Sequence, residues 1–343
     1  MSSSDKVAVL GGGSFGTVLA NLAARNGVPA TLWMRDRESA RRCLETRENA
    51  AYLPGYRLAD ALAITADLEQ ALGEASLVFF SVPSKAFRRL VEQAAPRLRE
   101  GAFAVSTAKG IEEGTFKRTS QILEEYLPEE RIGALSGPNL AREIAAGEIT
   151  ATVIASSNPA LCAAVQRALA SPRFRVYANP DRFGVELAGA LKNIFAIVAG
   201  IAAALGVGQN TLSVLITRSL AEMTRFAARL GADPMTFLGL AGVGDLIATC
   251  TSPLSRNFRV GLALGQGLSL EEATARVGQV AEGVNTTRLV KQKADELGVY
   301  MPLTSALYGT LFERRAVMDV LRDVLSSSKG DDVDFSVRYN HEL

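Results

Sequence analysis

Histidine is almost absent from this sequence, which has one in 343 residues, His341. It lies two residues from the C-terminus in the polar segment KGDDVDFSVRYNHEL, which we expect to be weakly ordered. A histidine general base, a Ser-His-Asp triad and a zinc site built on imidazoles are therefore disfavoured, and we expect no metal site. Proton chemistry, if there is any, must use Lys, Asp, Glu or Tyr.

Net charge and cysteine are also scarce. The 37 Lys and Arg residues nearly cancel the 36 Asp and Glu residues, so no global electrostatic field is available to hold nucleic acid or an anionic membrane. The three cysteines, Cys43, Cys162 and Cys250, are far apart without C-x-x-C spacing, which argues against disulfides, zinc and redox chemistry. We expect a cytoplasmic protein that binds no nucleic acid and holds any anion in a local site.

We expect no N-terminal targeting segment either, since MSSSDKVAVLGGG has no basic region and its apolar run stops at glycines. The most apolar stretch, residues 183–205, reaches the length of a membrane span, about 20 residues. Glu186, Lys192 and Asn193 interrupt it. We interpret it as a buried helix, with a membrane span as the alternative.

The first half of the chain alternates short apolar runs with helical segments. This pattern is typical of βαβ units and predicts a Rossmann-type α/β domain with a mostly parallel sheet at residues 1–180. Later stretches rich in Ala, Leu and Val recur at helical spacing, which predicts an all-α domain at residues 181–326, followed by a polar tail at 327–343. The predicted strands are Val7–Leu10, Ala30–Met34, Leu77–Phe80, Phe103–Ser106, Ile132–Leu135, Thr152–Ala155 and Phe174–Tyr177.

A glycine-rich turn, Gly11-Gly12-Gly13-Ser14-Phe15-Gly16, directly follows the first predicted strand and precedes an apolar helical run. This is the G-x-G-x-x-G pattern in its strand-turn-helix context. Gly11 permits the tight turn, Gly13 lets the backbone approach a pyrophosphate, and Gly16 lets the helix pack closely on the strand. The helix N-terminus adds free N–H groups for the phosphates. The pattern predicts a nicotinamide dinucleotide site and hence a dehydrogenase.

The segment after the second predicted strand bears on the choice of cofactor. Asp36 could bind the ribose 2′-hydroxyl of NAD(H), whereas Arg35 could pair with the 2′-phosphate of NADP(H). Both could also be solvated loop charges. We favour NADP(H), with NAD(H) also accepted.

Three later segments follow predicted strands, where a doubly wound sheet binds its ligands. They are Ser81–Ser84, Ala108–Gly110 and Ser136–Pro138. Lys109 places a cation at this rim of the sheet. It is either a ligand-binding residue or an ordinary surface lysine.

Lys192 lies in the most apolar helical segment of the chain, where an uncompensated ammonium is expensive to bury. Its neighbours at helical spacing are mostly small, and Glu186 projects about 120° away on the helix, so it is a poor partner. Desolvation lowers the pKa of a lysine towards neutral pH, and such a group can protonate the alkoxide formed when a ketone is reduced. The alternative is a structural lysine tied to a carboxylate from another helix.

Two segments downstream could bind an anion. Gly242-Val243-Gly244-Asp245 is a turn that opens another segment, and residues 252–257, SPLSRN, form a loop that enters a helix with Ser255 as its N-cap. Helix N–H groups, a hydroxyl, the Arg256 guanidinium and the Asn257 amide together suit a phosphate monoester. Simple capping beside a solvated arginine is the alternative.

These segments together resemble the NAD(P)-dependent glycerol-3-phosphate dehydrogenases of glycerophospholipid synthesis. The likeness covers nearly the whole chain through six ordered motifs: GGGSFGT, STAKGI, LSGPNLAREIA, ELAGALKNIFAIVAGI, GLAGVGDLIATCTSPLSRN and VAEGVNTT. Phe15 stands where this family often has Trp, Asn139 where Ser or Thr is usual, and Gln209-Asn210 where Asp-Asn is usual.

The resemblance implies a role for each motif. Lys192 is the proton donor and acceptor, and Lys109 contacts both substrate and cofactor. Implied substrate contacts are Gly137, Asn139, Asp245, Ser255, Arg256 and Asn257, and implied dinucleotide contacts are Ser14, Phe15, Arg35, Ala141, Arg256, Val280 and Glu282. The family is commonly a homodimer.

The reaction implied is reversible hydride transfer that reduces dihydroxyacetone phosphate to sn-glycerol 3-phosphate. Two other functions stay open on the residues alone. One is a lysine-dependent ketopantoate reductase or β-hydroxyacid dehydrogenase, which acts on carboxylates. The other is a non-catalytic NAD(P)H sensor, which would have no use for a proton donor at Lys192.

Overall fold

The computed structural model describes residues 6–316, so His341 and the predicted tail at 327–343 lie outside the described residues. The chain divides into two compact units between Glu186 and Leu187. We call them the N-terminal unit and the helical unit. The division falls within helix α8 (Arg182–Ala204), a few residues after the domain boundary that the sequence predicts at residue 180.

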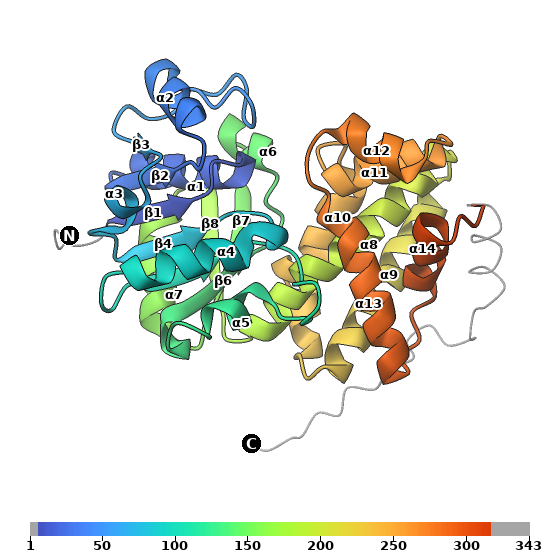
Figure 1. Ribbon diagram of the computed structural model, residues 1–343. Helices are drawn as coiled ribbons and strands as arrows, with labels where there is room; N and C mark the ends of the chain where they lie inside the picture. Colours follow the sequence, from blue (N-terminus) through green and yellow to red (C-terminus); the bar gives the residue numbers. More distant parts are fainter. Residues whose placement is uncertain (1–5, 317–343) are drawn as a thin grey trace. The chain divides into compact units, whose positions relative to one another are not determined.

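An eight-stranded sheet forms the centre of the N-terminal unit (Figure 1). Its order is β3-β2-β1-β4-β5-β6-β7-β8, and every neighbouring pair is parallel except β6 and β7. The Rossmann-type fold class is therefore confirmed, and one strand, β3, which has three residues, was not predicted. The strands are β1 (Val7–Leu10), β2 (Ala30–Trp33), β3 (Ala63–Thr65), β4 (Leu77–Phe80), β5 (Phe103–Ser106), β6 (Ile132–Ser136), β7 (Thr150–Ala155) and β8 (Phe174–Asn179).

Helices cover both faces of this sheet, and alternate residues of the strands pack against the two sets. Val7 and Val9 of β1 belong to one apolar cluster with residues of α1 and α7, whereas Ala8 and Leu10 belong to a second cluster with residues of α3, α4 and α5. Because both faces of the sheet are covered, its central strands, such as β1 and β4, are continuous apolar runs. The helices are α1 (Ser14–Arg25), α2 (Arg37–Thr46), α3 (Leu68–Leu72), α4 (Ser84–Ala94), α5 (Thr119–Leu123), α6 (Ala141–Ala146) and α7 (Pro159–Leu169), with turns η1 (Ala95–Arg97) and η2 (Glu129–Arg131).

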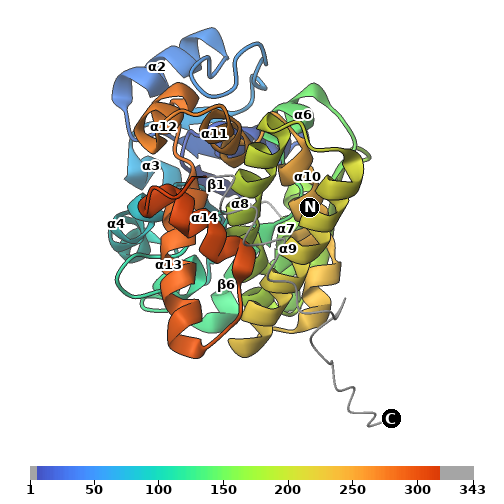
Figure 2. The same cartoon turned by 90° about the vertical axis from the view of Figure 1, so that its right-hand side faces the viewer.

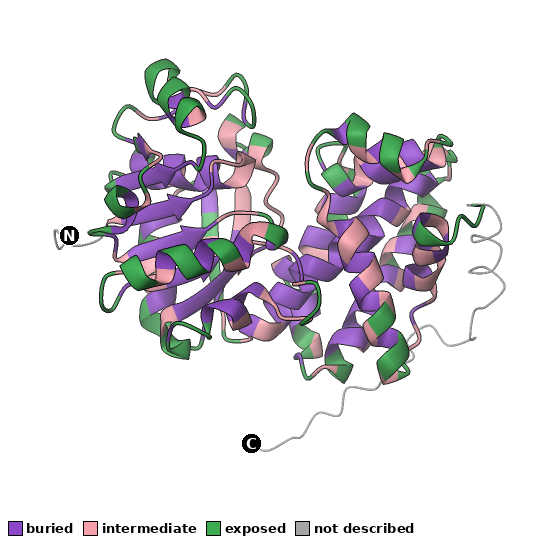
Figure 3. Cartoon of the chain, in the orientation of Figure 1, coloured by how far each residue is buried: buried purple, intermediate pink, exposed green. Residues whose placement is uncertain are grey.

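The described part of the second unit is built from helices, as the sequence predicts; in Figure 2, α13 and α14 lie side by side. Helix α8 has a mean hydropathy of 1.8 over an 18-residue window, and 83% of that window is buried inside the protein (Figure 3). This burial is that of a core helix, although its length and composition alone would allow a membrane span. The other elements are α9 (Gln209–Arg229), η3 (Pro234–Leu238), η4 (Leu240–Gly244), α10 (Asp245–Thr251), α11 (Arg256–Gly265), α12 (Leu270–Val277), α13 (Glu282–Leu297) and α14 (Pro302–Phe312).

Helices α8 and α11 cross at very short range through glycine. A Cβ atom on Gly200 of α8 would lie 2.1 Å from the Phe258 carbonyl oxygen, and one on Gly261 of α11 would lie 2.0 Å from the Ile197 carbonyl oxygen. No larger residue fits at either position without separating the helices. The crossing therefore sets how closely the start of α11 approaches α8.

A buried carboxylate joins α9 to α14. Glu222 is 2% exposed and accepts hydrogen bonds from the Leu303 N–H (2.6 Å), the Thr304 N–H (3.2 Å) and the Thr304 hydroxyl (3.1 Å). Helix α14 has no side-chain cap from its own N-cap residue, Met301, so Glu222 satisfies its first N–H groups from another helix. Burial nevertheless raises the pKa of Glu222 from 4.5 to about 7.

The raised pKa predicts a pH dependence of stability. The folded state binds a proton on the Glu222 carboxyl more tightly than the unfolded chain does. The stabilisation that comes from this tighter binding is therefore complete below the unfolded pKa of 4.5, and it is lost as pH rises through about 7. Between pH 5.5 and 7.5, we expect the free energy of unfolding to fall by about 2 kcal/mol more in the wild type than in Glu222→Gln. Urea unfolding of both proteins at the two pH values measures this difference. An equal change in the free energy of unfolding in the two proteins would contradict the prediction.

Candidate active site

The glycine-rich turn lies at the point where the strand order reverses, between β1 and β4. Gly11 has φ +127°, and a Cβ atom there would lie 2.2 Å from the Ser81 carbonyl oxygen. A Cβ atom on Gly16 would lie 2.1 Å from the Gly11 carbonyl oxygen. These two glycines let β1, the turn and α1 pack at backbone contact, as the G-x-G-x-x-G pattern predicts.

The N-terminus of α1 is open to an anion. Gly13 is its N-cap, no side chain caps the helix, and a Cβ atom on Gly13 would meet nothing within 4 Å. The N–H groups of the first turn, together with the helix dipole, can therefore accept a pyrophosphate. The Ser14 hydroxyl at this end donates to the Tyr52 carbonyl (2.7 Å), and Phe15 packs against the core.

Asn49, which was not predicted as a site residue, holds the glycine-rich turn through hydrogen bonds. Asn49 is 4% exposed, and its amide donates to the Gly12 carbonyl and to the Thr17 hydroxyl, both at 2.8 Å. These bonds fix the turn on one side and the first turn of α1 on the other. No local motif surrounds Asn49 in the sequence, so its role follows from the tertiary structure alone.

The two candidate selectors of cofactor after β2 differ in their surroundings. The Asp36 carboxylate caps α2 by accepting the Ser39 N–H at 2.8 Å, and the bonds with Ser39 lower its pKa. Arg35 is exposed beside it. The carboxylate thus already has a structural partner, and one of its oxygens is engaged in capping.

At the ends of β5 and β6, Lys109 and Gly137 come together. The Lys109 ammonium donates to the Gly137 carbonyl at 2.8 Å. Asn139 follows on the same loop; its amide nitrogen donates to the Thr152 hydroxyl (2.9 Å), while its buried amide oxygen has no hydrogen-bond partner among the described residues. A buried acceptor without a partner is costly, so this oxygen is suited to an O–H or N–H donor of a ligand. Ala141 begins α6 directly after this loop.

In the helical unit, Lys192 forms a buried ion pair. Lys192 is 6% exposed and Asp245 is 1% exposed, and the ammonium lies 2.8 Å from the Asp245 carboxylate. The ammonium also donates to the Thr249 hydroxyl. The lysine is therefore tied to a carboxylate from another helix, and that carboxylate is itself a predicted substrate contact. Thr249 was missed, although it lies one helical turn after Asp245 in the sequence.

The backbone before Asp245 is unusual. Residues Leu240–Gly244 form one turn of π-helix, and a Cβ atom on Gly242 would lie 2.1 Å from the Phe237 carbonyl oxygen. Such turns are rare and occur frequently at functional sites. Here the turn places Asp245 at the first position of α10, with its side chain directed at Lys192.

Cys250 follows Thr249 on α10 and is 1% exposed. Burial raises the pKa of its thiol to about 12, against the opposing effect of the nearby Lys192 ammonium. The thiol therefore stays neutral at physiological pH and is unsuited to proton transfer or nucleophilic attack. Of the buried groups described around the ammonium, Asp245 and Thr249 are the ones that bond it directly.

A chain of amides links α8, α11 and α13. The Asn257 amide donates to the Asn193 amide oxygen (2.8 Å) and accepts the Gly283 N–H (3.0 Å). Asn257 is 8% exposed and Asn193 is 5% exposed. Asn193, the neighbour of Lys192, was noted in the sequence only as an interruption of an apolar run.

The predicted anion-binding residues gather at the start of α11. Ser255 is the N-cap, and its hydroxyl accepts the Phe258 N–H at 3.2 Å, which confirms the predicted cap. Arg256 is the first residue of the helix and is exposed, whereas Asn257 is buried with its amide largely engaged. Of the two residues implied downstream as dinucleotide contacts, Val280 is 47% exposed and Glu282 begins α13.

Comparison with known proteins identifies relatives along the whole chain. The family model of the NAD-dependent glycerol-3-phosphate dehydrogenase N-terminus matches residues 6–162, and that of the C-terminus matches residues 181–322. A curated glycerol-3-phosphate dehydrogenase [NAD(P)+] from Azotobacter vinelandii is 60% identical over 329 residues, covering 96% of each chain.

Solved structures agree with these matches. The crystal structure of glycerol-3-phosphate dehydrogenase from Coxiella burnetii superposes with a TM-score of 0.89 at 35% identity, covering 94% of this chain and 99% of that one. A ketopantoate reductase from Ralstonia eutropha JMP134 superposes with a TM-score of 0.58 at 17% identity, covering 93% and 99%. The second likeness concerns the fold alone.

Proposed function

The chain belongs to the NAD-dependent glycerol-3-phosphate dehydrogenase family, and from this premise we propose that it reversibly reduces dihydroxyacetone phosphate to sn-glycerol 3-phosphate. It is an oxidoreductase that uses NAD(H) or NADP(H). The observation that carries the proposal is the buried Lys192–Asp245 pair, because burying two charges is costly and the family resemblance implies that both residues contact the substrate.

The N-terminal unit would hold the dinucleotide. The turn from Gly11 to Gly16 and the uncapped start of α1 fit a pyrophosphate in the structure. When bound, the nicotinamide supplies or accepts the hydride. The dinucleotide contacts that the family resemblance implies are Ser14, Phe15, Arg35, Lys109, Ala141, Arg256, Val280 and Glu282.

Lys192 would act as the general acid in reduction and the general base in oxidation. In reduction, the ammonium Nζ gives a proton to the carbonyl oxygen as this oxygen becomes an alkoxide. The Asp245 carboxylate compensates the charge of the ammonium and, with Thr249, fixes its direction. Lys109, Gly137 and Asn139 would orient the substrate, and the unpartnered oxygen of Asn139 is suited to accept a substrate hydroxyl.

The start of α11 would bind the phosphate. The Ser255 hydroxyl can donate while its oxygen caps the helix, the Arg256 guanidinium can make a bidentate contact, and backbone N–H groups at the start of α11 can donate as well. Because the Asn257 side chain is already engaged with Asn193 and Gly283, its part is to hold the start of α11 in place and to offer its backbone N–H and its second amide hydrogen.

The test is the oxidation of NADPH and of NADH, followed by absorbance, with dihydroxyacetone phosphate and with dihydroxyacetone. We expect rapid turnover with the phosphate ester and very slow turnover without the phosphate. Turnover of ketopantoate in preference to both would indicate the carboxylate-reducing alternative. Tight binding of NADPH with no turnover of any ketone would indicate a sensor.

The preference between cofactors should depend on Arg35. Because the Asp36 carboxylate caps α2 while the Arg35 guanidinium is exposed, we propose that Arg35 binds the 2′-phosphate of NADP(H). In Arg35→Ala, we expect kcat/KM for NADPH to fall about 10- to 100-fold, the worth of one charge-assisted hydrogen bond. The value for NADH should stay within about twofold. Steady-state kinetics with both cofactors measures this, and equal losses would contradict the assignment; Arg37→Ala is the matched control.

We further propose that the protein is a cytoplasmic homodimer that supplies sn-glycerol 3-phosphate to glycerophospholipid synthesis. The helical unit exposes apolar side chains that a second copy could cover, including those of Val214, Leu238 and Ile247. Light scattering during size-exclusion chromatography measures the oligomeric state.

A further inference from the structure

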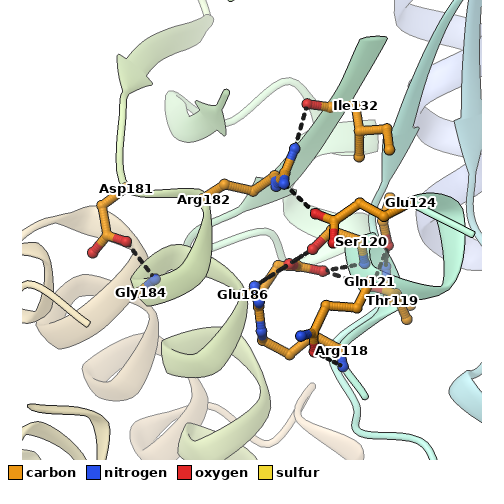
Figure 4. Close-up of polar contacts among 12 residues, drawn as sticks. Arg118, Thr119, Ser120, Gln121, Glu124, Ile132, Asp181, Arg182, Gly184 and Glu186 are labelled. Atoms are coloured by element: carbon orange, nitrogen blue, oxygen red, sulfur yellow. Dashed lines mark hydrogen bonds and ion pairs between the residues drawn. The ribbon is translucent and has the colours of Figure 1, made fainter. Parts of the chain in front are cut away.

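Another buried carboxylate, that of Glu186, lies at the start of α8, away from the groups assigned to chemistry. The Glu186 side chain is 4% exposed. In Figure 4 it faces Arg118, Thr119 and Ser120 at the beginning of α5. One oxygen accepts the Thr119 hydroxyl and the Ser120 N–H, both at 2.8 Å, and the other accepts the Arg118 guanidinium at 3.0 Å and the Ser120 hydroxyl. Every bond of this carboxylate is thus made to one short segment.

The contact continues to the end of β5. The Thr119 hydroxyl lies 2.7 Å from the Ser106 hydroxyl, and the Ser106 oxygen also accepts the Ala108 N–H at 3.2 Å. Ser106 is 1% exposed and Thr119 is 2% exposed, so water does not replace these partners. Ala108 is the residue directly before Lys109.

The carboxylate fixes the direction of every hydrogen bond in this chain. An ionised carboxylate accepts hydrogen bonds and cannot donate, so the Thr119 hydroxyl must donate its hydrogen to Glu186. The Thr119 oxygen can then only accept a hydrogen bond from Ser106, so the Ser106 hydroxyl must donate its hydrogen to Thr119. Its oxygen is left as an acceptor directed at the Ala108 N–H. Bonds ordered in this way polarise one another.

We propose that Glu186 is a positioning residue for Lys109, acting through Thr119 and Ser106 on the backbone of the loop that carries it. The inference rests on the proposed role of Lys109 as a substrate contact. Without the ordered chain, the Ser106 hydroxyl is free to rotate and the Ala108 N–H loses a fixed acceptor. The Lys109 ammonium would then sample positions other than the one bonded to the Gly137 carbonyl.

Other contacts also hold the start of α5 to the start of α8, so that a variant lacking one hydroxyl can be tested. Arg182 donates to the Ile132 carbonyl (3.1 Å) and to Glu124, which join the start of α8 to β6 and α5 (Figure 4). The Arg118 guanidinium also lies 4.1 Å above the Phe183 ring. Removing one hydroxyl should therefore leave the N-terminal unit folded.

Thr119→Val is the sharpest variant because valine keeps the shape of threonine and removes the hydroxyl. We expect kcat/KM for dihydroxyacetone phosphate to fall about tenfold, mainly through KM, since one ordered chain of hydrogen bonds is lost. The Kd for NADPH, measured by fluorescence, should rise by less than the KM for dihydroxyacetone phosphate, because the other implied dinucleotide contacts keep their positions. Ser106→Ala should act in the same direction. Thr224→Val is the matched control, because the buried Thr224 hydroxyl bonds a carbonyl of its own helix, that of Leu220.

A double-mutant cycle with Lys109→Met separates positioning from simple stability. If Thr119 acts through Lys109, Thr119→Val should have no further effect on kcat/KM in the Lys109→Met background. Independent losses in the two backgrounds, or a lowered melting temperature with unchanged KM, would overturn the inference while leaving the role of Lys109 intact. An unchanged kcat/KM in Lys109→Met alone would overturn the proposed role of Lys109 and the inference with it.

Discussion

Replacing Lys192 with methionine should reduce kcat about 10²- to 10⁴-fold at saturating substrate and cofactor, the range for loss of a general acid. The Lys192 ammonium is buried, and its two described partners, Asp245 and Thr249, cannot take its place as proton donors in the same geometry. The neighbouring Cys250 thiol, with its pKa raised to about 12, is too weak an acid. Stopped-flow and steady-state assays of NADPH oxidation with dihydroxyacetone phosphate measure the decrease in kcat.

The variant has a structural cost that must be separated from the chemical one. Removing the ammonium leaves the Asp245 carboxylate buried without its counter-charge, which typically costs about 3–5 kcal/mol of stability. The double variant Lys192→Met, Asp245→Asn removes both charges and should recover much of the stability without recovering turnover. Restored turnover in the double variant, or near-normal kcat in the single one, would refute the assignment of Lys192.

The sequence predicted most of the N-terminal unit because its signals are local. Most of the seven predicted strands are short apolar runs, and the glycine pattern follows β1 directly, so each can be recognised within a few residues. β3 was missed because a three-residue strand between turns has no periodicity to detect. It forms because β2 offers a parallel edge, on which Ala63 pairs with Thr31 and Thr65 pairs with Trp33.

The partners of the predicted residues could not be found in the same way. Lys192 was recognised as an unusual charge in an apolar helix, but its pairing with Asp245 spans 53 residues and depends on the π-helical turn before α10. Glu186 was considered only as an interruption of an apolar run and as a poor partner for Lys192 on the same helix. Its contacts with Arg118, Thr119 and Ser120 span 66 to 68 residues and leave no mark in the local sequence.

The partners of other buried polar residues could not be predicted from the local sequence either. Asn49, Glu222 and Asn193 each satisfy backbone or amide groups from distant elements. A single polar residue within an ordinary helix or loop has no pattern of its own, so its function depends on the groups that tertiary packing brings to it. Residues of this kind, inside a motif as Asn193 is or outside one as Asn49 is, hold neighbouring backbone and amide groups in place.

Replacing Arg256 with glutamine should reduce kcat/KM for dihydroxyacetone phosphate about 10²- to 10³-fold, the value of two charge-assisted hydrogen bonds to a phosphate. Arg256 is the first residue of α11, next to the Ser255 cap, so its guanidinium and the N–H groups of the helix can act on one anion. Glutamine keeps part of the length and polarity but has neither the charge nor the fork of the guanidinium. The loss should appear mainly in KM for the substrate.

The decisive comparison is with dihydroxyacetone, which has no phosphate. If Arg256 binds the phosphate, its replacement should leave the slow turnover of dihydroxyacetone within about twofold of the wild type, because no contact to this substrate is lost. Arg276→Gln is the matched control, since Arg276 is exposed on α12 and donates to Gln266. The family resemblance also implies that Arg256 contacts the dinucleotide, so each series is run at saturating NADPH. Equal losses with both substrates would then show that Arg256 supports the cofactor or the fold of α11, and the phosphate site would have to be sought elsewhere.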